Sequence, residues 1–243
     1  MSEPFAMLDF LPSTFKEPGE REYITFLWDA FDFNYEHGQY QMALLPYHML
    51  YMSFVYFSIW QIKLMRPVDF LHATIFQKNE RQVNAAPSPF TFHKVAEGEV
   101  FKFLRIIGCD EGQTRTFAEL VGERNKLAHA NGLIVCSGQQ DADQKIDAIL
   151  DQVAAIQAHM TPLLYQCLRS FLIDSAVPQE DREYEDPVDQ IREMLVHKHY
   201  FSKKDIEACR SFDIQTLSAE SNFPFMAVLF QEFVDLYSSE FAE

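Results

Sequence analysis

Cysteine is scarce in this sequence, and its spacing excludes the sites that depend on it. The four cysteines are Cys109, Cys136, Cys167 and Cys209, and no two of them form a C-x-x-C or comparable metal-ligand spacing. Unpaired thiols are typical of a reducing compartment. The amino-terminal residues also lack a basic region, an apolar stretch and a small-residue cleavage site. We therefore expect a cytoplasmic protein with no metal site and no cofactor.

Basic residues are also in short supply. The chain has 20 Lys and Arg against 36 Asp and Glu, which gives a net charge of −16. Broad, sequence-independent binding of DNA or RNA needs clustered Lys and Arg that neutralise phosphates, so this balance argues against it. Much of the acidic excess lies in EDREYEDPVD, residues 180–189. A small concave site elsewhere can still be locally basic.

No segment alternates apolar and polar residues over the length of a strand, and no internal repeat occurs. Apolar residues instead recur at steps of three and four, most clearly over residues 141–174. We expect an all-α fold. A helical bundle of four to five long helices would occupy residues 1–178, and an acidic linker with a carboxy-terminal helical extension would occupy residues 179–243.

Start and stop signals divide the chain into helices. Gly38 and Gly108 are expected stops, Ser202 is an expected N-cap, and Pro162 is expected to bend or split its helix. The expected helices cover about residues 20–37, 40–65, a stretch from 67, 98–108, 116–131, 141–174, 187–198, a stretch from 203, and 224–237.

Residues 42–62 contain no Asp, Glu, Lys or Arg and are long enough to span a bilayer. Aromatic side chains are spread through the middle of this segment, whereas a spanning helix collects them at the membrane interfaces. These features favour a buried core helix over a membrane span and predict no stable membrane association. His48, inside this segment, is expected to be a hydrogen-bonded core histidine or to approach a cleft.

The expected helix over residues 116–131 carries most of the stretch ERNKLAHANG, residues 123–132. Thr116 and Glu119 match a capping box, which predicts the start of the helix, and Asn131-Gly132 predicts its end. Because each helical residue advances by ~100°, several apolar residues fall within about 60° of Arg124. These residues are Phe117, Leu120, Val121, Leu127 and Ala128.

An arginine in the middle of an apolar stripe must be paired, must extend along the stripe, or must face a cleft or a partner chain. A neighbouring row holds Ala118, Gly122, Asn125 and His129. Two small residues in this row would let another backbone approach closely. We therefore expect Arg124, Asn125 and His129 to border a cleft.

A guanidinium and an imidazole suit cleavage of an RNA phosphodiester without metal. The imidazole can take a proton from a 2′-hydroxyl or give one to the leaving 5′-oxygen. The guanidinium can hold the charge that develops on the phosphoryl oxygens. Since one histidine cannot easily be acid and base at once, two chains meeting along this edge would form one composite site.

A structural interpretation explains the same residues. Arg124 can pair with a buried carboxylate of another helix, such as Glu36 or Asp32. His129 can be a last-turn residue that the helix dipole favours.

The stretch RNKLAHANG resembles the HEPN superfamily, whose members are all-helical bundles with an R-x4-6-H motif and commonly a polar residue after the arginine. Arg124, Asn125 and His129 match this pattern. The resemblance covers the motif helix closely and residues 20–175 only in general pattern. The branch that is paired with a nucleotidyltransferase antitoxin has a tyrosine two positions after the histidine, where this chain has Asn131.

The resemblance implies a metal-independent endoribonuclease whose active site forms across a homodimer. Arg124 and His129 would be catalytic, Asn125 would assist them, and we assign the adjacent Lys126 to substrate binding. HEPN domains are common as toxins and as antiphage-defence effectors, which implies an RNA substrate and an antitoxin or regulatory protein partner. The alternative is a non-catalytic HEPN-like module that binds a nucleotide, RNA or a partner protein.

Two other candidates lie near residue 200. His197 and His199, two positions apart, point to different sides of a helix, so they do not favour a metal site. The surrounding segment, HKHYFSKKDIEACRSF, loosely resembles a helix-turn-helix with Lys198, Lys203 and Lys204 as phosphate contacts. A solvated helix end is the preferred interpretation.

Overall fold

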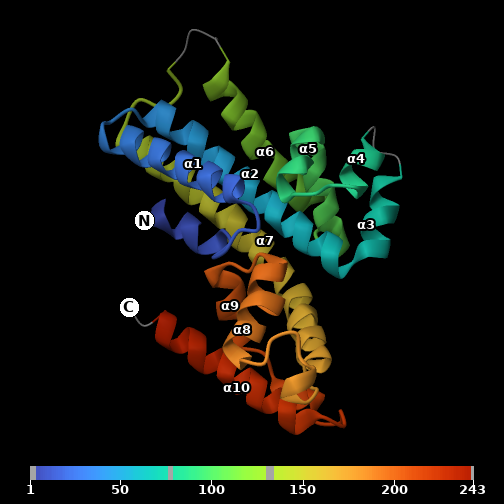
Figure 1. The fold of residues 1–243 in the computed structure, drawn as a ribbon. Coiled ribbons are helices and arrows are strands. Elements are labelled where there is room, and N and C mark those ends of the chain that lie inside the picture. Colours follow the sequence, from blue (N-terminus) through green and yellow to red (C-terminus); the bar gives the residue numbers. More distant parts are fainter. Residues whose placement is uncertain (1–3, 76–78, 130–133, 242–243) are drawn as a thin grey trace.

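The computed structural model describes residues 4–75, 79–129 and 134–241 of the chain. Helices hold 79% of the residues, and the described residues contain no strand, only one isolated bridge between Pro12 and Ser202. The expected all-α class is therefore confirmed. Figure 1 shows an elongated molecule in which the amino-terminal helices form one part, α8 to α10 form the other, and α7 reaches from one into the other.

The first two long helices, α1 (Pro18–Glu36) and α2 (Tyr40–Met65), form an antiparallel pair. Gly38 between them has a φ of 71°, a left-handed conformation that glycine adopts without steric cost, so the expected stop is confirmed. The aromatic rings of Phe31 and Tyr47 pack across the pair with centroids 4.7 Å apart.

The helix α2 is the centre of the core. Residues 50–62 are all buried, which is possible because the helix is apolar on every side and other helices surround it. Within the described residues, α2 is the one helix long and apolar enough to cross a membrane, and 83% of its most apolar window is buried inside the protein. The expected burial of this segment is confirmed.

Short helical segments follow and precede this pair. They are η1 (Pro4–Phe10), α3 (Pro67–Thr74), α4 (Glu80–Asn84), η2 (Pro89–Lys94), α5 (Glu97–Val100) and η3 (Phe101–Ile107). The expected single helix over residues 98–108 is thus one α-helical turn followed by a 3-10 helix. It ends as expected at Gly108, whose φ is 91°.

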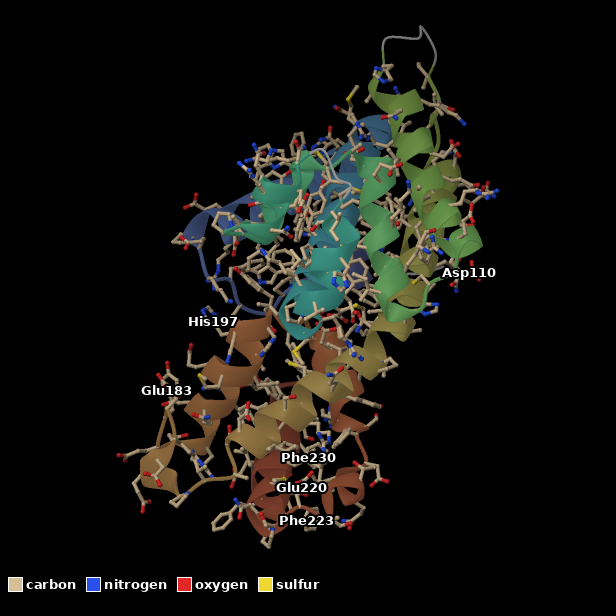
Figure 2. The ribbon with its side chains drawn as sticks, turned by 90° about the vertical axis from the view of Figure 1, so that its right-hand side faces the viewer. Asp110, Glu183, His197, Glu220, Phe223 and Phe230 are labelled. Carbon is tan, nitrogen blue, oxygen red and sulfur yellow. The ribbon has the colours of Figure 1, made fainter. Side chains whose placement is uncertain are left out.

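The motif helix α6 (Glu111–Ala128) begins earlier than expected. Asp110 is the N-cap: its Oδ1 accepts from the Gln113 backbone N–H at 2.8 Å, and Gln113 Oε1 accepts from the Asp110 N–H at 2.8 Å. Figure 2 labels Asp110 at this end of α6. The capping box expected at Thr116 and Glu119 is therefore wrong, since the Thr116 hydroxyl donates to the Gly112 carbonyl inside the helix. The stop expected at Asn131-Gly132 lies outside the described residues.

The long helix α7 (Gln139–Asp174) is continuous through Pro162, so of the two expected effects, a bend or a split, the split does not occur. Proline removes the hydrogen bond to the carbonyl of Ala158, and Ala158 is exposed, so water can satisfy that carbonyl. The residues expected at steps of three and four are buried: Ile146, Ile149, Val153, Ile156, Met160, Leu163, Cys167 and Phe171.

The extension consists of η4 (Gln179–Asp181), α8 (Pro187–Ile191), η5 (Arg192–His197), α9 (Lys203–Arg210), η6 (Ile214–Leu217) and α10 (Phe223–Glu240). The helix expected over 187–198 changes from α- to π-type hydrogen bonding at η5. The expected N-cap Ser202 is confirmed, because its hydroxyl accepts from the Asp205 N–H at 3.0 Å. The domain boundary at 178/179 stays a prediction.

Buried hydrogen bonds join the extension to the bundle. Asp205 of α9 accepts from Gln61 of α2 at 2.9 Å and from Gln157 of α7 at 2.7 Å. The Tyr200 hydroxyl lies 2.9 Å from a carboxylate oxygen of Glu20 in α1. His197 lies at the junction of the two parts in Figure 2. The two parts therefore share one continuous buried interior.

Candidate functional site

Arg124 lies on the inner side of α6 and forms an ion pair with Glu97, the first residue of α5. The two side chains are 25% and 34% exposed. The carboxylates expected as alternative partners, Glu36 and Asp32, belong to α1 and are not the ones used. A carboxylate does balance the charge of Arg124, but it comes from α5, a helix of a single turn.

A cavity of about 290 Å³ opens beside Arg124 between α2, α6 and α7. The Nε of Arg124 is buried and has no hydrogen-bond partner among the described residues. The cavity is lined by Leu44, His48, Leu120, Glu123, Arg124, Leu127, Asp141, Gln144, Lys145, Ala148 and Ile149. The guanidinium therefore combines an ion pair on one side with an unsatisfied donor on the other.

His48 of α2 lines the same cavity and is 3% exposed. Burial, and next the positive charge of Arg124, lower the pKa of His48 to about 3, so the imidazole is neutral near neutral pH. Its Nε2 is buried and unpartnered within the described part of the chain, so the hydrogen bond expected for a core histidine is absent at that atom. The alternative expectation, that His48 approaches a cleft, agrees with the structure.

Asn125 and His129 lie at the carboxy-terminal end of α6. Asn125 is half-buried, and its carbonyl accepts from the His129 backbone N–H at 3.1 Å. His129 is exposed and caps the helix with an extended backbone, φ −88° and ψ 146°. The helical row expected from Ala118 to His129 thus ends at Asn125. Among the described residues, no hydrogen bond or ion pair links the His129 side chain to Arg124.

The rest of this edge is open. Gly122 is exposed, and a Cβ placed there would meet no atom within 4 Å, while Ala118 is half-buried. Lys126 is exposed and forms an ion pair with Glu123. Small side chains on an exposed helix edge leave space for a second backbone, so Ala118 and Gly122 place no steric obstacle to a partner along it.

A second cavity has Glu97, the partner of Arg124, in its lining. It has a volume of about 480 Å³, and its lining includes Glu97 with Tyr23, Met52, Tyr56 and Phe90. Glu97 thus lines this cavity and Arg124 lines the other, so the ion pair connects the two linings.

The metal-ligand, cysteine and histidine candidates from the rest of the sequence provide less evidence for a site. The described residues contain no group of three or more His, Cys, Asp or Glu placed to hold a metal ion. All four cysteines are free and buried. His199 is partly buried, and burial followed by the charges of Lys198 and Lys16 lowers its pKa to about 4.

Two residues of this site were not assigned to it from the sequence. Glu97 gave no signal, because it stands in a short helix with no periodic pattern. His48 gave a weak one, as the histidine of an otherwise apolar helix.

No protein-family model, no curated protein and no solved structure matches the chain, so its assignment depends on its own residues and their geometry.

Proposed function

We propose that the chain is a metal-independent endoribonuclease of HEPN type that acts as a homodimer in the cytoplasm, as a toxin or an antiphage-defence effector. The catalytic residues are Arg124, His129 and Asn125, and Lys126 binds substrate. The observation that carries the proposal is the end of α6, where an exposed imidazole and a half-buried amide stand on an open edge beside a guanidinium that borders a cavity.

The reaction is a displacement within the RNA chain. The 2′-hydroxyl oxygen attacks the adjacent phosphorus, the bond from phosphorus to the 5′-oxygen breaks, and the products carry a 2′,3′-cyclic phosphate and a 5′-hydroxyl. One imidazole takes the proton of the 2′-hydroxyl, and a second gives a proton to the leaving 5′-oxygen. The guanidinium stabilises the negative charge on the phosphoryl oxygens.

The ion pair with Glu97 is compatible with this role. A guanidinium has five N–H donors, and Glu97 accepts from Nη2 alone. The carboxylate fixes the direction of the side chain, and Nη1, unlike the buried Nε, supplies donors for a phosphate. The exposure of Arg124, 25%, allows a phosphate to reach it from solvent.

The second imidazole comes from a second copy of the chain. His129 is exposed at the tip of α6, and Gly122 leaves the adjacent helix edge open. A two-fold axis along this edge would bring two histidines and two arginines into one groove. An antitoxin or regulatory protein that covered this groove would silence the enzyme.

The test is cleavage of a panel of RNAs by the full chain in the presence of a chelator. Arg124→Ala and His129→Ala are expected to reduce the rate by about 10²-fold or more, because charge stabilisation by the guanidinium and acid-base catalysis by the imidazole each contribute about that much. Arg115→Ala on the same helix and His72→Ala on α3 are the controls, since both side chains are exposed and lie away from the site. Fragments should end in cyclic phosphate.

Cleavage that needs a divalent metal, or that both alanine variants retain, would contradict the proposal.

Light scattering tests the dimer directly. The wild type is expected to be dimeric, and Gly122→Arg, which places a long charged side chain on the edge, is expected to give a monomer that does not cleave RNA.

A second candidate is a non-catalytic HEPN-like module that binds a nucleotide, RNA or a partner protein. The pairing of Arg124 with Glu97 and the cavity beside it favour this candidate. The non-catalytic module requires that no RNA in the panel is cleaved. It also requires that any growth effect of expression survives both Arg124→Ala and His129→Ala.

A further inference from the structure

The cavity between α2, α6 and α7 has features of a ligand site that the nuclease proposal does not use. At about 290 Å³ it lies at the lower end of the range for small-molecule sites, about 300 Å³ and above. Aliphatic side chains form much of its wall, among them Leu44, Leu127 and Ile149. Its size and apolar walls suit one flat ring system and do not suit a chain of several nucleotides.

The charges around the cavity cancel. Arg124 and Lys145 contribute two positive charges, and Glu123 and Asp141 contribute two negative charges. Lys145 Nζ and Asp141 Oδ1 lie 3.6 Å apart. Because His48 is also neutral, the lining as a whole has no formal charge to attract a phosphate into the cavity. The cavity therefore fits a neutral ligand.

Two residues of the cavity lining each carry a buried polar atom without a partner in the described part of the protein. These atoms are Nε2 of His48, whose side chain is 3% exposed, and Nε of Arg124. Buried polar atoms are nearly always hydrogen-bonded, so an unpartnered pair at one cavity requires an explanation. A neutral imidazole can accept or donate at Nε2, depending on its tautomer, and the arginine can only donate.

We propose that this cavity binds one unpaired nucleobase of the RNA substrate. The edge of a base carries both hydrogen-bond donors and acceptors, which matches His48 and Arg124, and its ring faces match the aliphatic walls. Arg124 borders the cavity and the open end of α6, so a base inside the cavity leaves its phosphate beside the guanidinium. The inference rests on the proposed function, since it makes the cavity the specificity site of the same nuclease.

The experiment measures binding of the four ribonucleosides to the full chain by saturation-transfer NMR, with no RNA present. Ala148→Trp places an indole at the cavity from an exposed position of α7, so it fills the site without disturbing the core. It is expected to weaken nucleoside binding by about tenfold or more. His48→Phe, which keeps a ring but removes the polar atom, is expected to weaken binding and to reduce the preference among bases.

The matched control is Ala154→Trp, because Ala154 is also an exposed alanine of α7 but does not line the cavity. It should bind nucleosides like the wild type. Circular dichroism of each variant shows whether it is folded. Failure of every nucleoside to bind the wild type, or equal binding by wild type and Ala148→Trp, overturns the inference.

The two proposals fail separately. Loss of RNA cleavage in His129→Ala together with no nucleoside binding by the wild type overturns the nucleobase site and leaves the nuclease standing. Nucleoside binding that depends on Ala148, in a chain that cleaves no RNA, supports the nucleobase site and overturns the nuclease.

Discussion

Replacing Asp205 by alanine is expected to weaken the packing of the extension against the bundle and to lower the free energy of unfolding. Asp205 is 4% exposed and lies where α2, α7 and α9 meet. Its carboxylate accepts hydrogen bonds from Gln61 at 2.9 Å, from Gln157 at 2.7 Å and from the Ser202 backbone N–H at 3.0 Å. Asp205→Ala leaves the Gln157 amide and the Ser202 N–H without this acceptor, whereas the Gln61 amide keeps the Tyr200 carbonyl at 3.4 Å.

The magnitude follows from the two donors that lose their acceptor. Each such donor costs about 1–3 kcal/mol, so their sum is about 2 kcal/mol or more. Part of that cost is offset, because burial is the largest influence on this carboxyl and raises its pKa, which means that the charged form is itself unfavourable. We expect Asp205→Ala to lower the free energy of unfolding by about 2–4 kcal/mol.

The assay is urea unfolding followed by far-UV circular dichroism. The control is Asp213→Ala, which removes another aspartate that caps a helix, here by accepting from the Gln215 N–H at 3.0 Å in an exposed setting. The control should lose about 1 kcal/mol. A loss at Asp205 no larger than at Asp213 would refute the reasoning, because it would show that the buried donors find water or other partners.

The dependence on pH gives a second measure of the same group. A carboxyl whose folded pKa is raised above the ordinary 3.8 contributes stability at low pH that is lost as the pH rises through the raised value. Asn at this position cannot ionise. The stability of the wild type relative to Asp205→Asn should therefore fall as the pH increases over that interval, and a difference that rises would contradict the assigned direction.

Three further outcomes are expected. Gly108→Ala should lower the free energy of unfolding by about 1 kcal/mol in urea, because the position has a φ of 91°, and an unchanged stability would contradict this. Glu97→Gln should change stability by less than about 1 kcal/mol, since the pair with Arg124 is partly exposed, and should tighten RNA binding in fluorescence anisotropy; weaker binding would show that Glu97 positions the guanidinium. The thiols should resist a disulfide reagent until urea unfolds the protein, because burial raises the pKa of Cys109 and Cys136 to about 11; rapid reaction of the native protein would contradict it.

Much of the fold could be predicted because its signals are local. The buried face of α7 follows from apolar residues at steps of three and four, and the glycine stops at Gly38 and Gly108 follow from the backbone freedom that a left-handed residue requires. Ser202 capped its helix as expected because a hydroxyl at that position satisfies an amide of the first turn. Each of these signals depends only on neighbouring residues.

The start of α6 shows how a local signal fails. Asp110 with Gln113 and Thr116 with Glu119 both fit a capping box, and the chain uses the first. The additional helical turn buries Thr114 and places the Gln113 side chain 2.9 Å from His159 of α7. Contacts with a distant helix therefore decide between two patterns that are locally equivalent.

The candidate site depends on such distant contacts even more. The spacing of Arg124, Asn125 and His129 assigns positions on one helix. Of the alternatives that the apolar stripe left open for the arginine, the structure shows an ion pair and a cavity. The partner in that ion pair, Glu97, is 27 residues earlier, and the histidine that lines the cavity belongs to α2. Since the Glu97 carboxylate accepts from one nitrogen of the guanidinium and His48 lies in the lining of the same cavity, residues outside the motif form much of its surroundings. Substitutions at Glu97 and His48 consequently test the proposed function as directly as substitutions of the motif residues themselves.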